Sequence, residues 1–123
     1  MEQQTILIID DDPTWLKLLS RFFSDNGYAV RTAISCASAI ETIRFNKSDC
    51  VVLDFNLSDG DATCVCAAIR TGEEHRTPIV IFSSDPAAEV CLDSEHRADK
   101  FLFKTAPLKE LLAAVTELLA VHN

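Results

Sequence analysis

Charged and hydroxyl side chains follow four apolar runs of this 123-residue chain, at the point where each run ends. They are Asp10-Asp11-Asp12, Asp54, Ser83 and Lys104. If the runs are parallel strands of one sheet, their carboxyl ends share one edge and these side chains converge. Three carboxylates held close together repel, so that one takes up a proton or a cation neutralises them. Because Asp10, Asp11 and Asp54 offer only oxygen ligands, they favour a hard cation such as Mg²⁺ over zinc.

The same residues support phosphoryl transfer to a carboxylate, a reaction in which a protein contributes mainly positioning and charge neutralisation. Asp54 is the candidate nucleophile. Mg²⁺ and the Lys104 ammonium are expected to offset charge on the transferring group. The Ser83 hydroxyl is expected to donate a hydrogen bond to a phosphoryl oxygen once it is attached. Taken singly, these residues also have structural interpretations; Asp11 and Asp12, for example, suit the N-terminus of a helix.

Five strands are predicted to position these side chains. Four are continuous apolar runs, as expected of strands covered on both faces, and a weaker fifth suits a sheet edge. They are Ile6–Ile9, Cys50–Leu53, Ile79–Phe82 and Phe101–Phe103, with Tyr28–Thr32 as the edge strand.

Five helices are predicted between and after the strands, because apolar residues recur there at helical spacing. Asp12 is a candidate N-cap for the first helix, with Pro13 at its first position. Four of these helices have an apolar stripe along one side, formed by Trp15, Leu18, Leu19, Phe22 and Phe23; Ile40 and Ile43; Val65, Ala68 and Ile69; and Leu108, Leu111, Leu112, Val115, Leu118 and Leu119. The remaining helix, fourth in the chain, is a less regular stretch from Pro86 to about Glu95. Right-handed crossovers then predict an α/β fold, a doubly wound five-stranded parallel sheet in the flavodoxin-like order 2-1-3-4-5.

The composition of the chain argues against several classes of protein, namely those that bind nucleic acid, associate with membranes or are secreted. A formal net charge of -8 opposes binding to nucleic acid or an anionic membrane, because both require clustered Lys and Arg. No apolar run approaches the roughly 18 residues of a membrane helix, and the first residues lack the pattern of a signal peptide. The five cysteines form an odd set without a Cys-x-x-Cys pair, which is typical of reduced thiols. We therefore expect one cytoplasmic domain spanning residues 1–123, with no direct nucleic-acid or membrane contact.

Some cysteines and histidines could suggest a metal site. Cys64 and Cys66 stand two residues apart, but no histidine pair lies near them in the sequence, so we interpret them as small buried hydrophobes. The histidines fall in predicted loops or the tail and are expected on the surface: His75, His96 and His122.

Four motifs in this order and spacing make the chain resemble the receiver domains of two-component response regulators, of the chemotaxis-regulator-like kind. The resemblance covers essentially the whole chain. Its motifs are Ile8–Pro13, Val52–Asn56, Pro78–Ser83 and Phe101–Lys104.

The resemblance implies a role for each site residue. Asp11 and Asp54 would ligate Mg²⁺ directly, Asn56 would do so through its backbone carbonyl, and Asp10 would act through water. Asp54 would be the phosphoryl acceptor. Such a domain is regulatory and not an enzyme with a separate substrate, since it catalyses only its own phosphotransfer and dephosphorylation.

The resemblance also implies a switch and partners. Ser83 matches the switch hydroxyl, and Phe101 matches the aromatic residue that changes rotamer on activation. The phosphoryl donor would be a sensor histidine kinase or a histidine phosphotransfer protein. An output partner, which the sequence does not identify, would meet the face formed by the fourth helix, fifth strand and fifth helix. A phosphorylation-dependent homodimer stays open, as does the choice between a stand-alone receiver and one cut from a longer protein.

The chain departs from the family pattern at several positions. Lys104 is followed by Thr105, where the family usually has Pro, and the next Pro is Pro107; a trans bond after Lys104 is expected. Arg97 and Lys100 stand where the family often has glycine, which makes a left-handed cap of the fourth helix less favourable. The loop after Asp54 also lacks the usual Pro.

Two other functions compete with this prediction. One is a receiver-like module that binds partners without phosphorylation. The other is an Asp-nucleophile phosphohydrolase, because the segment Asp54–Ser58 is faintly similar to the Asp-x-Asp-x-Thr motif of haloacid-dehalogenase-like enzymes. Such enzymes use the second Asp as general acid and base, a role that Asn56 does not fill.

Overall fold

The computed structural model describes residues 3–72 and 76–122, without the side chain of residue 122. Its elements in chain order are β1 Thr5–Ile9, α1 Pro13–Asp25, β2 Ala29–Ala33, α2 Cys36–Phe45, β3 Cys50–Leu53, β4 Asn56–Leu57, β5 Gly60–Asp61, α3 Ala62–Thr71, β6 Ile79–Ser83, the 3₁₀ helix η1 Pro86–Leu92, β7 Lys100–Phe103 and α4 Leu108–His122. Five strands form a parallel sheet in the order β2-β1-β3-β6-β7. Counted among themselves these strands have the order 2-1-3-4-5, which confirms the predicted doubly wound sheet.

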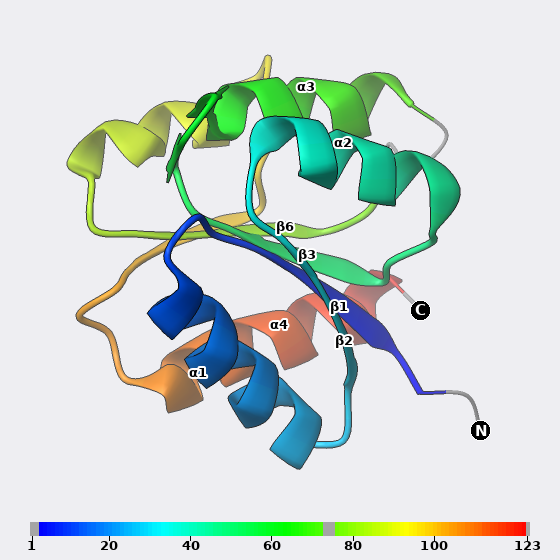
Figure 1. Cartoon of the computed structure of the whole chain (residues 1–123). Helices are drawn as coiled ribbons and strands as arrows, with labels where there is room; N and C mark the ends of the chain where they lie inside the picture. The colour runs from blue at the N-terminus through cyan, green and yellow to red at the C-terminus, as the bar shows by residue number, and fades with distance from the viewer. Residues whose placement is uncertain (1–2, 73–75, 123) are drawn as a thin grey trace.

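Helices cover both faces of the sheet. In Figure 1, α1 and α4 lie on one face and α2 and α3 lie on the other. Alternate side chains of each strand supply the two cores. Along β1, Ile6 and Ile8 belong to the core under α1 and α4, whereas Leu7 and Ile9 belong to the core under α2, α3 and η1. All residues of β3 and β6 are buried, which explains their continuous apolar sequence.

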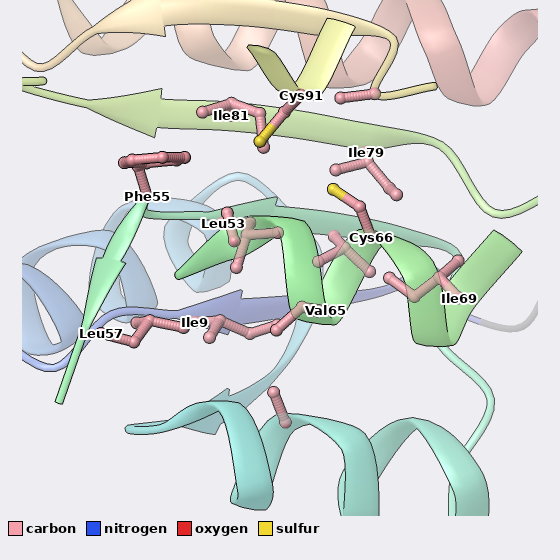
Figure 2. Packing of buried hydrophobic residues seen from close by; sticks show 14 of the residues in the cluster. Ile9, Leu53, Phe55, Leu57, Val65, Cys66, Ile69, Ile79, Ile81 and Cys91 are labelled. Atoms are coloured by element: carbon pink, nitrogen blue, oxygen red, sulfur yellow. The ribbon is translucent and has the colours of Figure 1, made fainter. Parts of the chain in front are cut away.

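The second of these cores is shown close up in Figure 2. Val65, Cys66 and Ile69 of α3 point toward the sheet, and all three side chains are fully or almost fully buried. Cys91 brings η1 into the same cluster. On this face, the strands are therefore held in place by side-chain packing as well as by the backbone hydrogen bonds between them.

The first helix begins as predicted, although its apolar stripe is narrower than predicted. The Asp12 side chain accepts a hydrogen bond from the Thr14 backbone N–H, and Pro13 occupies the first helical position. Leu19 and Phe23 are buried. Leu18 was predicted to lie on the same stripe, but it is 46% exposed. It precedes the buried Leu19, and successive residues of a helix point in different directions, so Leu18 turns away from the sheet.

The fourth helical segment differs most from the prediction. It is the 3₁₀ helix η1, and it ends at Leu92 rather than near Glu95. The Asp93 carboxylate accepts hydrogen bonds from the backbone N–H groups of Glu95 and His96, so the chain turns there instead of continuing the helix.

The cysteines are free thiols. Cys66 is buried as predicted, but Cys64 is exposed and that part of the prediction is wrong. His96 is partly buried rather than fully on the surface, with its ring nitrogen 2.9 Å from Asp93. His75 lies outside the described residues, and so does the side chain of His122. In the parts of the chain described here, no helix combines the length and apolarity needed to cross a membrane.

Arg97, at the position where the family often has glycine, adopts a left-handed backbone with φ of 54°. An L-residue in this region is disfavoured by the clash of its Cβ with the backbone. The guanidinium of Arg70 helps to hold this turn, because it donates to the Arg97 carbonyl at 3.2 and 2.8 Å. It also contacts the Asp99 carboxylate at 3.2 Å. The same Asp99 oxygen accepts from the Ile79 backbone at 2.7 Å, which ties the turn to the start of β6.

Replacing Arg97 with glycine is expected to raise the free energy of unfolding by up to about 1.6 kcal/mol. Relief of the left-handed strain, about 1–2 kcal/mol, exceeds the added freedom of glycine in the unfolded chain, about 0.4–1 kcal/mol. Urea unfolding measures this difference. Arg97→Ala keeps the Cβ and is the control; equal stabilisation by both variants would contradict an origin in backbone strain.

Candidate functional site

The side chains predicted to converge do meet at the carboxyl edge of the sheet. Backbone hydrogen bonds continue one residue beyond the strands and fix their positions. The Asp54 N–H donates to the Ile9 carbonyl at 2.9 Å, and the Lys104 N–H donates to the Ser83 carbonyl at 3.0 Å. Similarly, the Asp10 N–H donates to the carbonyl at the end of β2 at 3.1 Å. The functional groups therefore stand on the rigid part of the fold.

Three carboxylates form an acidic cluster there. Asp10, Asp11 and Asp54 each place one oxygen within 4.8 Å of the others. Asp10 and Asp54 are buried and Asp11 is exposed. Burial raises the pKa of Asp10, and the neighbouring Asp54 charge raises it further, against the opposing effect of hydrogen bonds from Lys104 and the Asp12 backbone. An oxygen-only cluster of this charge can hold a divalent metal ion.

One ammonium group partly neutralises the cluster. Lys104 Nζ lies 2.8 Å from Asp10 Oδ2 and 3.0 Å from Asp54 Oδ2, and its side chain is 9% exposed. Burial by itself would lower the pKa of Lys104, but the two carboxylate partners outweigh it and the pKa is raised. Lys104 therefore stays protonated, and three carboxylates against one ammonium leave negative charge for a cation to balance.

An open pocket of about 370 Å³ lies over Asp54. Besides Asp54, it is lined by Asn56, Ser83, Ser84, Asp85, Pro86 and Lys104. The Ser83 oxygen accepts from the Asp85 backbone N–H at 3.2 Å. The Asn56 amide donates to Asp85 Oδ2 at 2.9 Å; this bond and one from the Ala87 backbone lower the pKa of Asp85. The pocket thus leads from solvent to a carboxylate flanked by an ammonium and a hydroxyl.

Residues 6–116 match the family of response regulator receiver domains. The chain belongs to this family. Response regulator MprA of Mycobacterium sp. (strain KMS) is 34% identical over 114 residues, which are 93% of this chain and 50% of that protein. Two-component response regulator ORR26 of Oryza sativa subsp. japonica is 34% identical over 109 residues, 86% of this chain and 18% of that protein. The receiver domain thus spans about half the length of MprA and less of ORR26.

Solved structures agree with the family. A two-component response regulator from Clostridium difficile is 33% identical, with a TM-score of 0.88 over 98% of this chain and 99% of that one. A response regulator from Chloroflexus aurantiacus is 30% identical, with a TM-score of 0.88 over 97% of this chain and 99% of that one. The comparisons therefore group this receiver domain with response regulators, and they favour neither alternative function.

The predicted site residues differ in how they lie. Asp10, Asp11, Asp54, Ser83 and Lys104 gather at the acidic cluster or its pocket. Asn56 also lines the pocket, with its side chain turned to Asp85. Phe101 is partly buried against the core under α2, α3 and η1, its ring 4.7 Å from that of Phe103. The metal-ligand, switch and acceptor roles of these residues stay predictions.

Sequence reasoning did not identify Asp85 as part of the site. It N-caps η1 through the Ala87 backbone, and its second oxygen binds Asn56. The pair Asp85-Pro86 repeats the pattern of Asp12-Pro13 at the start of α1, so the capping role of Asp85 could have been predicted together with the helical stretch from Pro86. Its contact with Asn56, from a distant part of the chain, could not.

The loop after Asp54 forms an unpredicted two-stranded hairpin, β4 paired with β5. The Asp59 carboxylate, between these strands, accepts from the Cys36 and Ala37 backbone N–H groups at 2.7 and 3.0 Å. Those two backbone hydrogen bonds are the main causes that lower the pKa of Asp59. The hairpin thus fastens the loop that carries Asn56 to the N-terminus of α2.

Neutralising Asp10 is expected to stabilise the metal-free protein. Because burial raises the pKa of Asp10, its ionised form costs stability at neutral pH, and this cost disappears as the pH falls below the ordinary value of 3.8. Asp10→Asn should raise the free energy of unfolding by about 1 kcal/mol at pH 7 and by much less at about pH 3. Urea unfolding in EDTA at both pH values checks this. Asp11→Asn, at an exposed position, should raise the free energy of unfolding less. If Asp10→Asn is less stable than the native protein at pH 7, the ionised Asp10 side chain does not cost stability and the prediction is wrong.

Proposed function

We propose that residues 1–123 form one receiver domain that accepts a phosphoryl group on Asp54 in a Mg²⁺-dependent reaction. The observation that carries the proposal is the placement of Asp54, which adjoins the acidic cluster, pairs with Lys104 and lines the open pocket. A carboxylate in this setting can act as a nucleophile toward phosphorus, with cations at hand for the charge that develops.

Asp10, Asp11 and Asp54 fit a magnesium ion, because hard oxygen ligands and excess negative charge suit this cation. The receiver domain of a sensor histidine kinase from Pseudomonas aeruginosa, which shares the fold at 20% identity, has a magnesium ion in its active-site cleft. Asn56 would add its backbone carbonyl. The ion would supply charge neutralisation at the phosphoryl oxygens.

In the proposed reaction, an Asp54 oxygen attacks the phosphorus of the donor and an aspartyl phosphate forms. The bond between phosphorus and the donor atom breaks, and its electron pair leaves with the donor. Lys104 is already paired with Asp54 at 3.0 Å, so its ammonium needs little movement to bind a phosphoryl oxygen. Its raised pKa keeps it cationic at neutral pH before the transfer.

The proposed physiological donor is a sensor histidine kinase or a histidine phosphotransfer protein. The similarity to two-component response regulators from Oryza sativa subsp. japonica and Clostridium difficile supports this choice. The Asp54 side chain is 11% exposed, and its pocket opens to solvent, so a phosphohistidine on another protein can approach it.

Ser83 and Asp85 offer a route from the site to η1. The Ser83 oxygen accepts from the Asp85 N–H, and the Asp85 side chain caps η1 at the Ala87 backbone. If Ser83 turns its hydroxyl toward a phosphoryl oxygen, the cap of η1 is drawn with it. Phe101, on the adjoining β7, would then move inward as the resemblance implies.

The face formed by η1, β7 and α4 is the proposed output surface. On these elements, Val90 and Leu92 of η1 and Phe103 of β7 expose 44%, 40% and 46% of their surfaces. Exposed apolar side chains on elements linked to the site suit a partner whose affinity depends on phosphorylation.

Incubation with acetyl phosphate and Mg²⁺ is expected to add one phosphoryl group to the protein. Intact-mass measurement should show a single adduct that EDTA abolishes and that Asp54→Asn lacks. Asp85→Asn, in the same pocket, controls for loss of a neighbouring carboxylate and should keep the adduct. A folded native protein that gains no adduct from acetyl phosphate or from a phosphorylated phosphotransfer protein would contradict the proposed function.

Replacing Ser83 with alanine is expected to leave Asp54 able to accept phosphate while reducing the structural response. Without the hydroxyl, nothing draws the η1 cap toward the phosphoryl group, so amide chemical-shift changes in η1 and β7 should fall by about half or more. Ser84→Ala is the matched control, because Ser84 is the exposed neighbour lining the same pocket. An undiminished response in phosphorylated Ser83→Ala would rule out this route.

A further inference from the structure

The indole of Trp15 lies next to the acidic cluster, although neither the sequence motifs nor the proposed chemistry uses it. Lys104 Nζ stands 5.0 Å from the centroid of the Trp15 ring. This distance is within the range of a cation–π interaction, in which an ammonium is attracted to the negative face of an aromatic ring. Tryptophan is the aromatic side chain that binds cations best in this way.

The core helps to fix the position of the indole. Trp15 is the third residue of α1, whose start is set by Pro13 and the Asp12 cap. Its ring meets Phe82 edge-on, with centroids 5.5 Å apart and planes at 87°. Phe82 is almost completely buried in β6. The ring is therefore held by packing against the core under α1 and α4 as well as by its contact with Lys104.

The indole acts on Lys104 without competing for its other partners. An ammonium has three N–H donors, and two of them bind Asp10 and Asp54 at 2.8 and 3.0 Å. During transfer the hydrogen bond to Asp54 must pass to a phosphoryl oxygen. The contact with Trp15, like the hydrogen bond to Asp10, needs no such exchange, so it helps to keep the ammonium in place while the bond to Asp54 changes.

We propose that Trp15 is a positioning residue for phosphoryl transfer, which holds the Lys104 ammonium over the acceptor through the face of its indole. This inference rests on the proposed function. The reaction with acetyl phosphate balances without any bond to Trp15. An Asp54 oxygen bonds to phosphorus, the bond from phosphorus to the acetate oxygen breaks, and acetate leaves with the electron pair.

Substitutions at position 15 test this role by the rate of phosphorylation. Trp15→Leu removes the aromatic face, and the initial rate of adduct formation with acetyl phosphate and Mg²⁺ should fall about three- to tenfold. Trp15→Phe keeps a ring and should retain at least about half of the native rate. Phe22→Leu is the control, because it makes a similar change on the same helix and in the same core. A folded Trp15→Leu protein with the native rate, or an equal loss in Phe22→Leu, would overturn the proposal.

Fluorescence tests the contact without phosphorylation, because Trp15 is the only tryptophan of the chain. In metal-free protein, Lys104→Met removes the cation from the ring and should change the emission. Lys17→Met, at an exposed position on α1, should not. Unchanged emission in Lys104→Met would overturn the contact. If the native protein takes no phosphoryl group, the proposed function and the role of Trp15 in transfer fail together, whereas the emission separately decides whether the contact exists.

Discussion

The attraction between one ammonium and two buried carboxylates is the interaction on which the site depends. Parallel strands deliver Asp10 and Asp54 to the same edge of the sheet, where burial and the neighbouring Asp54 charge disfavour the charged form of Asp10 and raise its pKa. Lys104, arriving from the end of β7, bridges both. The compensation is incomplete, and the remaining negative charge makes the edge attractive to a cation. Burying carboxylates would be unfavourable in an ordinary loop, but here it leaves negative charge that a bound cation can balance.

The sheet makes this arrangement rigid. β3 and β6 are buried on both faces, and each supplies alternate side chains to the two cores. A shift of register by one residue would turn these side chains to the opposite face. Asp54 is therefore fixed by its place after Leu53, while the loop beyond it is tied at Asn56 to Asp85 and at Asp59 to α2. The site combines a fixed acceptor with a loop held by a few polar contacts.

The strands, their order and the convergence of the acidic residues could be predicted from sequence, because continuous apolar runs and the residues after them are local signals. Contacts between distant polar side chains could not. Asp85 gave only the signal of a helix start, and Asn56 was predicted to contribute to the site only through its backbone carbonyl. Similarly, the left-handed turn at Arg97 contradicts the local preference of the residue, and hydrogen bonds from Arg70 to its carbonyl help to hold it. Tertiary contacts decide such features.

The distribution of thiols gives each side of the sheet its own chemical probe. Cys36, Cys66 and Cys91 lie in the core under α2, α3 and η1, whereas Cys50 lies in the core under α1 and α4. Burial raises the pKa of both Cys36 and Cys50 to about 12, so they react with alkylating reagents only when the structure opens. The exposed Cys64 provides an internal standard for reagent activity. Alkylation kinetics resolved by cysteine would therefore reveal whether the two layers open together or one at a time.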